Sequence, residues 1–269
     1  MSCHRESAAV KVKPSPAPST LLYGFHAVGV RLKVAPRSIV ELYVDADRRD
    51  ARMRQLCSRA DALGVPLQVV DAARLAGLCG GTSHQGVVAR VVPLGREHSL
   101  EDWLDRRDSS PTSGVAPDPL LLLVLDGVTD PHNVGACLRV ADGAGAHAVI
   151  APKDHACGLT PVVAKVSSGA SESVPYFLVT NLACTLRDLQ DRDVTLVGLG
   201  STAARVLYAA DLTRPVALVL GAEGKGLRRL TQECCDELVS IPMLGAVESL
   251  NVSVASGVCL YEARRQRTS

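Results

Sequence analysis

Short runs of mostly apolar residues, spaced along residues 120–269, constrain the fold more than any other feature. The first, "LLLLVL" (120–125), has no polar residue, as expected of a strand that is buried on both faces. Most of these runs are separated by enough chain for a crossover helix. We therefore expect an α/β domain built on a parallel sheet. Its expected strands are 120–125, 147–151, 195–199, 216–220 and 237–241.

A smaller α/β unit is expected to precede this domain. A strand "IVELYV" (39–44) is followed by a charged helix (48–63), and two further apolar runs follow that helix. Polar residues rich in Pro, Ser and Gly then suggest a flexible linker. The expected divisions are a disordered tail at 1–19, the small unit at 20–93, a linker at 94–119 and the larger domain at 120–269.

Composition excludes several classes of protein. The net charge is only +1 and aromatic residues make up 3% of the chain, so RNA binding would need local basic patches rather than a polycationic surface or base-stacking platforms. Nine cysteines include no CxxC pair, so we expect no zinc site, no other metal and a reducing compartment. With no apolar leader and no apolar run of membrane-spanning length, we expect a cytoplasmic protein without membrane contact.

The stretch "LDGVTDPHNVGACLR" (125–139) places polar residues where a buried strand leads into a helix. Asn133 and Arg139 are six residues apart, which at ~100° per residue puts them on different faces of a straight helix. They share a site only if Asn133 lies in the cap and Arg139 reaches back along the helix. The alternative is that Asn133 caps the helix and Arg139 points into solvent.

A second stretch, "ALVLGAEGKGLRRL" (217–230), has a glycine-rich turn after an apolar strand, with a helix expected from about Gly226. It matches neither of the common phosphate-binding glycine motifs. Glu223 would repel a polyphosphate, whereas it suits a ligand with hydroxyls or positive charge, such as S-adenosylmethionine. A plain left-handed turn is the alternative interpretation.

A third stretch, "IPMLGAVESLNVSVASGVCLYEARRQR" (241–267), begins a helix that is apolar on nearly all sides. Such a helix must be buried in the domain or covered by a partner subunit. Ser249 and Asn251 precede it, and a Ser-Leu-Asn turn can also be a simple helix cap. Three polar loops that each follow a strand would converge at the carboxyl edge of a parallel sheet, where such folds bind ligands.

These three stretches together resemble the motifs of the SpoU branch of the SPOUT RNA 2′-O-ribose methyltransferases. "YGFHAV" (23–28) and "HQGVVARV" (84–91) resemble the substrate-recognition domain of the bacterial subgroup that methylates a guanosine in large-subunit ribosomal RNA. Glu248 departs from the small residue expected before Ser-Leu-Asn. The resemblance implies S-adenosyl-L-methionine as cofactor, a C-terminal trefoil knot in the parallel sheet domain, and a homodimer that acts on ribosomal RNA.

The resemblance also implies roles for individual residues. Arg139 would face the nascent 2′-oxyanion, because a guanidinium stays protonated and is better suited to stabilising an anion than to removing a proton. The implied catalytic residues are Arg139, Asn133, Glu223, Ser249 and Asn251, and the implied cofactor-binding residues are Leu199, Gly200, Gly221, Ile241, Met243 and Leu250.

The N-terminal unit has no catalytic signature of its own. Candidates for RNA contact are Arg31, Lys33, His84 and Gln85, with solvated charges and a structural histidine as the alternative. Two other functions stay open on the sequence. One is a methyltransferase of the same family that acts on transfer RNA or another ribosomal site, and the other is a non-catalytic ribosome-assembly factor that binds RNA.

Overall fold

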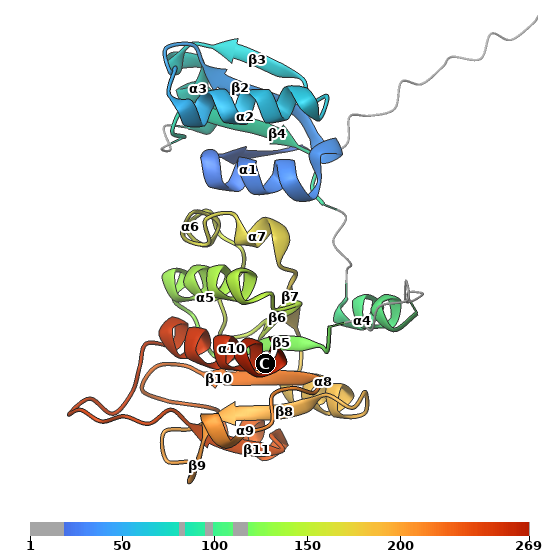
Figure 1. Ribbon diagram of the computed structural model, residues 1–269, viewed down its shortest axis with the longest axis vertical. Coiled ribbons are helices and arrows are strands. Elements are labelled where there is room, and N and C mark those ends of the chain that lie inside the picture. The colour runs from blue at the N-terminus through green and yellow to red at the C-terminus, as the bar shows by residue number, and fades with distance from the viewer. Residues whose placement is uncertain (1–18, 81–83, 95–98, 110–117, 269) are drawn as a thin grey trace, which may run out of the picture.

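The computed structural model describes residues 19–80, 84–94, 99–109 and 118–268. A small N-terminal domain and a larger C-terminal domain are stacked along the long axis of the molecule (Figure 1). The expected tail at 1–19 lies, except for its last residue, outside the described residues. No helix within the described ranges is long and apolar enough to cross a membrane.

The N-terminal domain has a four-stranded mixed sheet in the order β1-β4-β2-β3. Only β2 and β3 pair in parallel, whereas β4 runs antiparallel to both of its neighbours. The side chain of Asp50 caps α2 by accepting bonds from the backbone N–H groups of Arg52 and Met53. The elements are β1 (Thr20–Tyr23), α1 (Phe25–Val34), η1 (Pro36–Ser38), β2 (Ile39–Asp45), α2 (Ala51–Ala62), β3 (Leu67–Val70), α3 (Ala72–Cys79) and β4 (Val87–Val91).

The C-terminal domain has a seven-stranded sheet in the order β7-β6-β5-β10-β8-β11-β9, and every pairing in it is parallel. The parallel α/β domain expected from the apolar runs is therefore confirmed. The two edge strands, β7 and β9, were not among the expected strands. The strands are β5 (Leu121–Asp126), β6 (Ala148–Pro152), β7 (Tyr176–Val179), β8 (Thr195–Leu199), β9 (Arg205–Val206), β10 (Val216–Gly221) and β11 (Glu237–Ser240).

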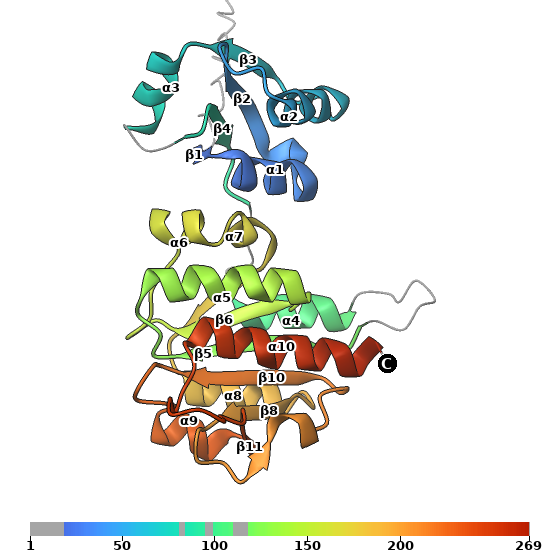
Figure 2. The same ribbon diagram turned by 60° about the vertical axis from the view of Figure 1, so that its left-hand side comes forward.

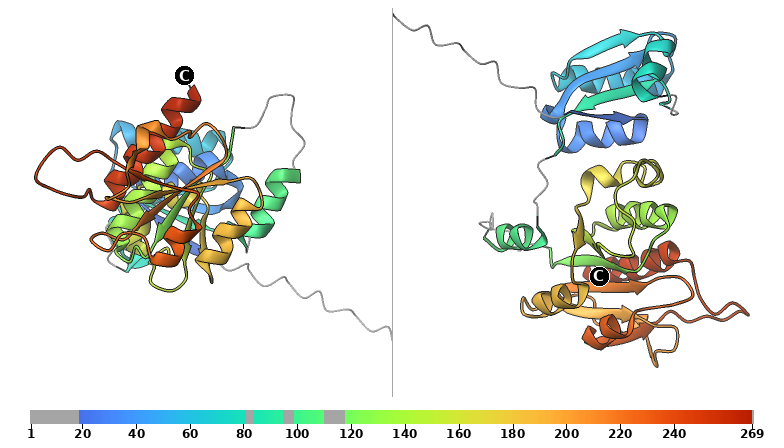
Figure 3. Two further views of the ribbon diagram at one scale, coloured as in Figure 1. Left: turned by 90° about the horizontal axis from the view of Figure 1, so that it is seen from below. Right: turned by 180° about the vertical axis from the view of Figure 1, so that it is seen from behind.

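Helices cover both faces of this sheet, as the views from below and behind show (Figure 3). Alternation along β5 turns Leu121, Leu123 and Leu125 into one core and Leu122 and Val124 into the other. The first core is closed by α5 (Pro131–Ala144), α6 (Pro161–Val166), α7 (Ala170–Ser173) and α10 (Val252–Thr268). The second is closed by α4 (Leu100–Ser109), α8 (Leu182–Gln190) and α9 (Arg229–Cys234).

Two helices also differ from the sequence-based expectations. Helix α4 lies inside the range expected to be a linker, because Leu100 and Leu104 fall on one helical face and are buried against the second core. Helix α9 begins at Arg229 rather than near Gly226, since the glycine-rich turn closes on itself through a hydrogen bond from Gly226 N–H to the carbonyl of Ala222.

The two domains meet where α1 lies against α7 (Figure 2). The Arg31 guanidinium of α1 donates to the Glu172 carboxylate of α7, with both side chains largely buried at 6% and 11% exposure. Arg31 also donates to the Ser38 hydroxyl and the Val92 carbonyl. Gly169 permits the close approach, because a Cβ there would lie 2.9 Å from the His26 carbonyl oxygen.

His147 joins α4 to the start of β5. Its Nδ1 accepts from the Leu121 N–H (2.9 Å), and its Nε2 lies 3.1 Å from the Arg107 guanidinium. Burial, reinforced by the positive charge of Arg107, lowers the pKa of His147 from 6.5 to about 4. The imidazole is therefore neutral in the folded protein at pH 7.

This burial predicts a pH dependence of stability. Between pH 6.5 and about 4 the unfolded chain binds a proton at His147 that the folded protein excludes, so the free energy of unfolding falls as the pH is lowered. His147→Asn, which keeps a short acceptor near Leu121, should lose less stability over this window. Urea denaturation at steps from pH 7 to pH 4.5 measures the difference, and parallel curves for the two proteins would contradict the assignment.

Candidate functional site

A cavity of about 420 Å³ lies at the carboxyl edge of the C-terminal sheet. It is lined by the segments that follow β8, β10 and β11, as the parallel strand order requires. Its volume falls within the range of small-molecule sites. All six residues expected to bind the cofactor line it: Leu199, Gly200, Gly221, Ile241, Met243 and Leu250.

The glycine-rich turn after β10 shapes one wall of this cavity. A Cβ on Gly221 would lie 2.0 Å from the carbonyl carbon of Gly226, so no other residue fits there without moving the backbone. Gly224 and Gly226 have φ values of +73° and +65°, which glycine adopts without strain. The turn is thus a backbone loop folded tightly over the end of its strand.

Asp126, at the end of β5, holds the far side of this turn. Its buried carboxylate accepts from the backbone N–H of Arg228 (2.9 Å), and the Arg228 guanidinium lies 3.5 Å from its other oxygen. Asp126 was not among the residues expected in the site. The available signal was an ionisable residue directly after a fully apolar strand, a position where burial demands a partner.

Glu223 joins the tip of the turn to two other segments. Its Oε1 accepts from Asn133 Nδ2 of α5 and from the backbone N–H of Val252 at the start of α10, each at 3.2 Å. Asn251 Nδ2 donates to Asn133 Oδ1 (3.0 Å). The N-cap of α5 is Asp130, which accepts from the His132 N–H, so Asn133 is not the capping residue. Asn133, Glu223 and Asn251 therefore form one polar cluster beside the cavity.

Arg139 is not part of this polar cluster. It shares a stripe of α5 with Gly135, which packs closely on Val166 of α6, and with Asp142, which accepts from Ser173 of α7. Its side chain is exposed and, within the described residues, makes no hydrogen bond or ion pair. Ser249, the fifth expected catalytic residue, lines the cavity.

The four residues expected to contact RNA differ in exposure. Arg31 is buried and paired with Glu172, whereas Lys33 is exposed at the end of α1. His84 Nδ1 accepts from the Gly86 N–H, and Gln85 is exposed with a left-handed backbone (φ 54°). Gln85 also lines a hollow of about 450 Å³ between the first strand and helix of the chain and α6.

The lining of the 420 Å³ cavity fits S-adenosylmethionine chemically. Leu199, Ile241 and Leu250 offer an apolar surface for a flat ring, and the carboxylates of Glu223 and Glu248 suit positive charges. A metal site has less support, since the described part of the chain brings no three His, Cys, Asp or Glu side chains together.

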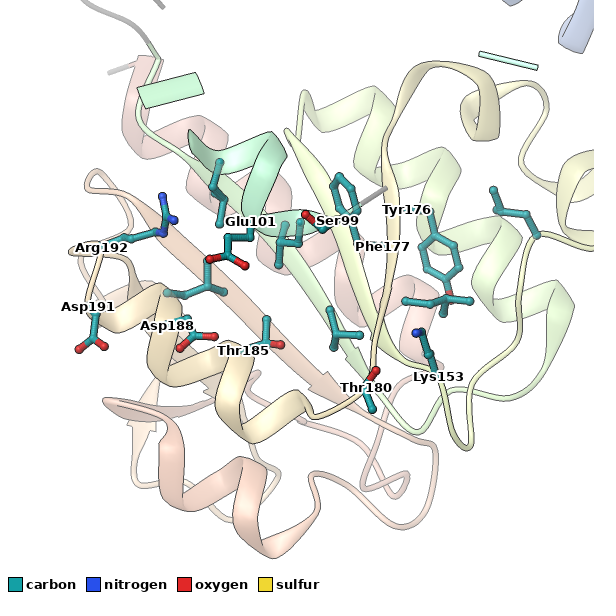
Figure 4. A pocket seen from close by; sticks show the side chains of 16 residues that line it. Ser99, Glu101, Lys153, Tyr176, Phe177, Thr180, Thr185, Asp188, Asp191 and Arg192 are labelled. Carbon is teal, nitrogen blue, oxygen red and sulfur yellow. The ribbon is translucent and has the colours of Figure 1, made fainter. Parts of the chain in front are cut away.

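A larger hollow, of about 800 Å³, lies between α4, the edge strand β7 and α8 (Figure 4). Its polar side chains include Glu101, Lys153 and Asp188, which the figure shows on separate elements. None of its lining residues belongs to the cavity at the carboxyl edge or to the polar cluster. Size alone therefore does not identify the functional site in this fold.

Comparison with known proteins is consistent with this geometry. The 23S rRNA (guanosine-2′-O-)-methyltransferase RlmB of Ralstonia nicotianae is 58% identical over 250 residues, covering 93% of this chain and 97% of the relative. That of Bordetella pertussis is 55% identical over 251 residues, covering 93% and 99%. The SpoU methyltransferase AviRb of Streptomyces viridochromogenes, solved in complex with AdoMet, aligns with a TM-score of 0.70 at 27% identity, covering 93% and 91%.

Two family descriptions match separate parts of the chain. Residues 21–96 match the RNA 2′-O ribose methyltransferase substrate-binding domain. Residues 120–261 match the SpoU rRNA Methylase family, over the region that carries the cavity and the polar cluster. The chain belongs to the SpoU rRNA methylase family.

Proposed function

We propose that this protein transfers a methyl group from S-adenosylmethionine to the ribose 2′-hydroxyl of a guanosine in 23S ribosomal RNA. The observation that carries this proposal is the cavity at the carboxyl edge, with the Asn133–Glu223–Asn251 cluster beside it, in a chain of this family. The choice of guanosine as the nucleotide and of 23S ribosomal RNA as the substrate rests on the names of the relatives. A cytoplasmic location follows as part of the proposal, because bacterial ribosomal RNA is found there.

The N-terminal domain favours ribosomal RNA over transfer RNA. The RlmB relatives align over 93% of this chain, including that domain. A TrmH/SpoU tRNA modifying enzyme of A. aeolicus aligns over only 55% of it, with a TM-score of 0.50. A non-catalytic RNA-binding factor would not need a cavity that suits the cofactor.

The cofactor and the residues near the cavity would have different roles in the reaction. The bound cofactor supplies an electrophilic methyl group on a positively charged sulfur. Asn133, Glu223 and Asn251 hold the turn and the start of α10 in place, so that the cavity keeps its shape. Arg139, by its match to the family motif, would stabilise the negative charge that develops on the 2′-oxygen. Its side chain leans toward the N-terminal end of α5, the end that carries Asn133.

We further propose that the segment from β11 into α10 completes a trefoil knot. Support comes from two observations. Three loops, each of which follows a strand, surround one cavity. The helix that comes next, α10, packs against α5, and in the sheet β10 lies between β8 and β5, the strand that leads into α5. Threading of this kind is rare in proteins. It would bury the apolar side chains of α10 that the sequence pattern required to be covered.

We also propose a homodimer. Helix α10 buries Val252, Ala255 and Leu260 against the domain, yet Val254 and Tyr261 remain 52% and 54% exposed, seven residues apart on one face. Leu244 and Val247, in the loop before α10, are more exposed still. An apolar surface of this kind is typical of a subunit interface.

Tyr261→Asp should dissociate the dimer, because it places a charge in the proposed interface. Tyr208→Asp is the matched control, since Tyr208 is equally exposed (54%) on a different element. Sedimentation at micromolar concentration should give about twice 28.3 kDa for the unchanged protein and the control, and about 28.3 kDa for Tyr261→Asp. A monomeric unchanged protein with full activity would refute the homodimer.

Glu223→Ala should weaken cofactor binding roughly tenfold or more, because it removes the acceptor shared by Asn133 and Val252. Glu223→Gln keeps a carbonyl oxygen at the same place and should retain most of the affinity. Isothermal titration with S-adenosylmethionine measures both. Equal losses in the two variants would mean that the charge of Glu223, and not its hydrogen bonds, is what matters.

Arg139→Ala should lower single-turnover methyl transfer by roughly 10²–10³, the scale for one lost oxyanion donor. Cofactor affinity should change far less, because the interaction strengthens only in the transition state. Arg139→Lys should restore little, since an ammonium lacks the planar fork. Near-normal methyl transfer by Arg139→Ala would mean that this arginine points into solvent and has no part in catalysis.

The same variant tests the substrate in cells. Ribose-methylation mapping of ribosomal RNA from cells lacking the gene should show the loss of one guanosine mark. The unchanged gene should restore this mark, and the Arg139→Ala gene should not. If cells lacking the gene kept all ribose methylations of ribosomal RNA but lost one in transfer RNA, the substrate would be transfer RNA instead.

A further inference from the structure

Basic side chains gather on the N-terminal domain close to its junction with the C-terminal domain. Arg52 of α2 places Nη2 3.0 Å from Nε2 of His26 of α1. The guanidinium groups of Arg48 and Arg52 lie over the ring of the buried Phe25, at 4.6 and 4.7 Å from its centroid. Arg48 is also held by the Gln85 carbonyl and the Asp50 carboxylate. Packing on Phe25 thus fixes both guanidinium groups before any ligand arrives.

Arg139 of α5 faces this same junction. It lies on the stripe of α5 that packs against α6 and α7, between Gly135 and Asp142. The α6–α7 connection contains Gly169, which is in close contact with the backbone of α1 at His26. Burial, and then the positive charges of Arg52 and Arg139, lower the pKa of His26, so both arginines are near this ring. The surface formed by His26, Arg48, Arg52 and Arg139 therefore runs from one domain to the other.

The charge on this surface is poorly compensated. Arg48 has Asp50 as an ion-pair partner. Within the residues that the structure describes, neither the Arg52 nor the Arg139 side chain has a carboxylate at ion-pair distance, whereas Arg31 and Arg264 each have one and Arg192 has two. In a chain with a net charge of only +1, such a local excess suits an anion that extends along the surface.

We infer that His26 and Arg52, supported by Arg48, bind backbone phosphates of the RNA next to the nucleotide whose ribose faces Arg139. The inference rests on the proposed function and adds the residues that align the substrate. A guanidinium fork matches phosphate geometry. Because Nε2 of neutral His26 accepts from Arg52, its Nδ1 carries the proton and can donate to the RNA.

The ion pair between Arg31 and Glu172 would act on this surface as a positioning element. It lies at the contact between α1 and α7, so it fixes the distance of His26 and Arg52 from Arg139. Arg31 thereby contributes to RNA recognition without touching RNA. This accounts for an arginine that the sequence suggested for RNA contact but that is buried at 5% exposure.

Arg52→Ala tests the inference, with Arg54→Ala as the matched control. Both arginines are exposed on α2, but they flank the buried Met53 on opposite sides, and the Arg54 side chain bonds only to the Arg49 carbonyl within the described residues. Binding of a 23S ribosomal RNA transcript is titrated at several salt concentrations. Arg52→Ala should weaken binding roughly tenfold and reduce the slope of log affinity against log salt by about 0.7–0.9, the value for one lost phosphate contact.

The control variant should keep both the affinity and the slope of the unchanged protein, and S-adenosylmethionine titration should be the same for all three proteins. His26→Ala should weaken RNA binding but should change the slope of log affinity against log salt by less than the loss of one charged phosphate contact, since a neutral donor is lost. Equal effects of Arg52→Ala and Arg54→Ala, or no effect of Arg52→Ala, would overturn the inference. Absence of methyl transfer by the unchanged protein would instead refute the proposed function, because RNA titration does not depend on transfer.

Discussion

The carboxylate of Glu223 ties together three segments that are far apart in the sequence. One oxygen accepts from Asn133 at the start of α5 and from the Val252 N–H at the start of α10, and Glu223 itself sits at the tip of the turn after β10. The cavity has its shape because these three segments are held at fixed positions. Asp126 does the same on the other side of the turn through the Arg228 N–H.

Different parts of helix α5 face the cavity and the domain junction. Its first turn carries Asn133, which bonds to Glu223 beside the cavity, while the stripe of Gly135, Arg139 and Asp142 faces α6, α7 and the domain junction. Gly135 is needed because a Cβ there would lie 2.7 Å from the side chain of Val166. The close packing of α6 on α5 brings the N-terminal domain near Arg139. Asn133 and Arg139 therefore belong to one helix, which in the proposed function would favour precise alignment of the cofactor with the substrate.

The distribution of charge near the domain junction is more informative than the net charge of the chain. The chain is almost neutral, yet a group of arginines with few carboxylate partners lies close to the domain junction, near an ion pair that is largely buried. Removing one partner of a buried pair leaves an unpaired charge, which is costly. The Arg31–Glu172 contact thus resists rotation of one domain against the other. This arrangement gives the N-terminal domain a defined place over α5 rather than a loose attachment.

The sequence alone determined the parallel sheet and the order of the three loops, because apolar runs and glycine-rich turns are local signals, and its resemblance to a known family indicated six of the residues that line the cavity. It did not reveal Asp126 as the anchor of the turn, the burial of Arg31, or the position of Arg139 on the junction side of α5. Each of these depends on a partner more than 100 residues away or on another helix packing alongside. Only tertiary packing decides such contacts, since no pattern within one segment specifies which distant side chain will lie against it.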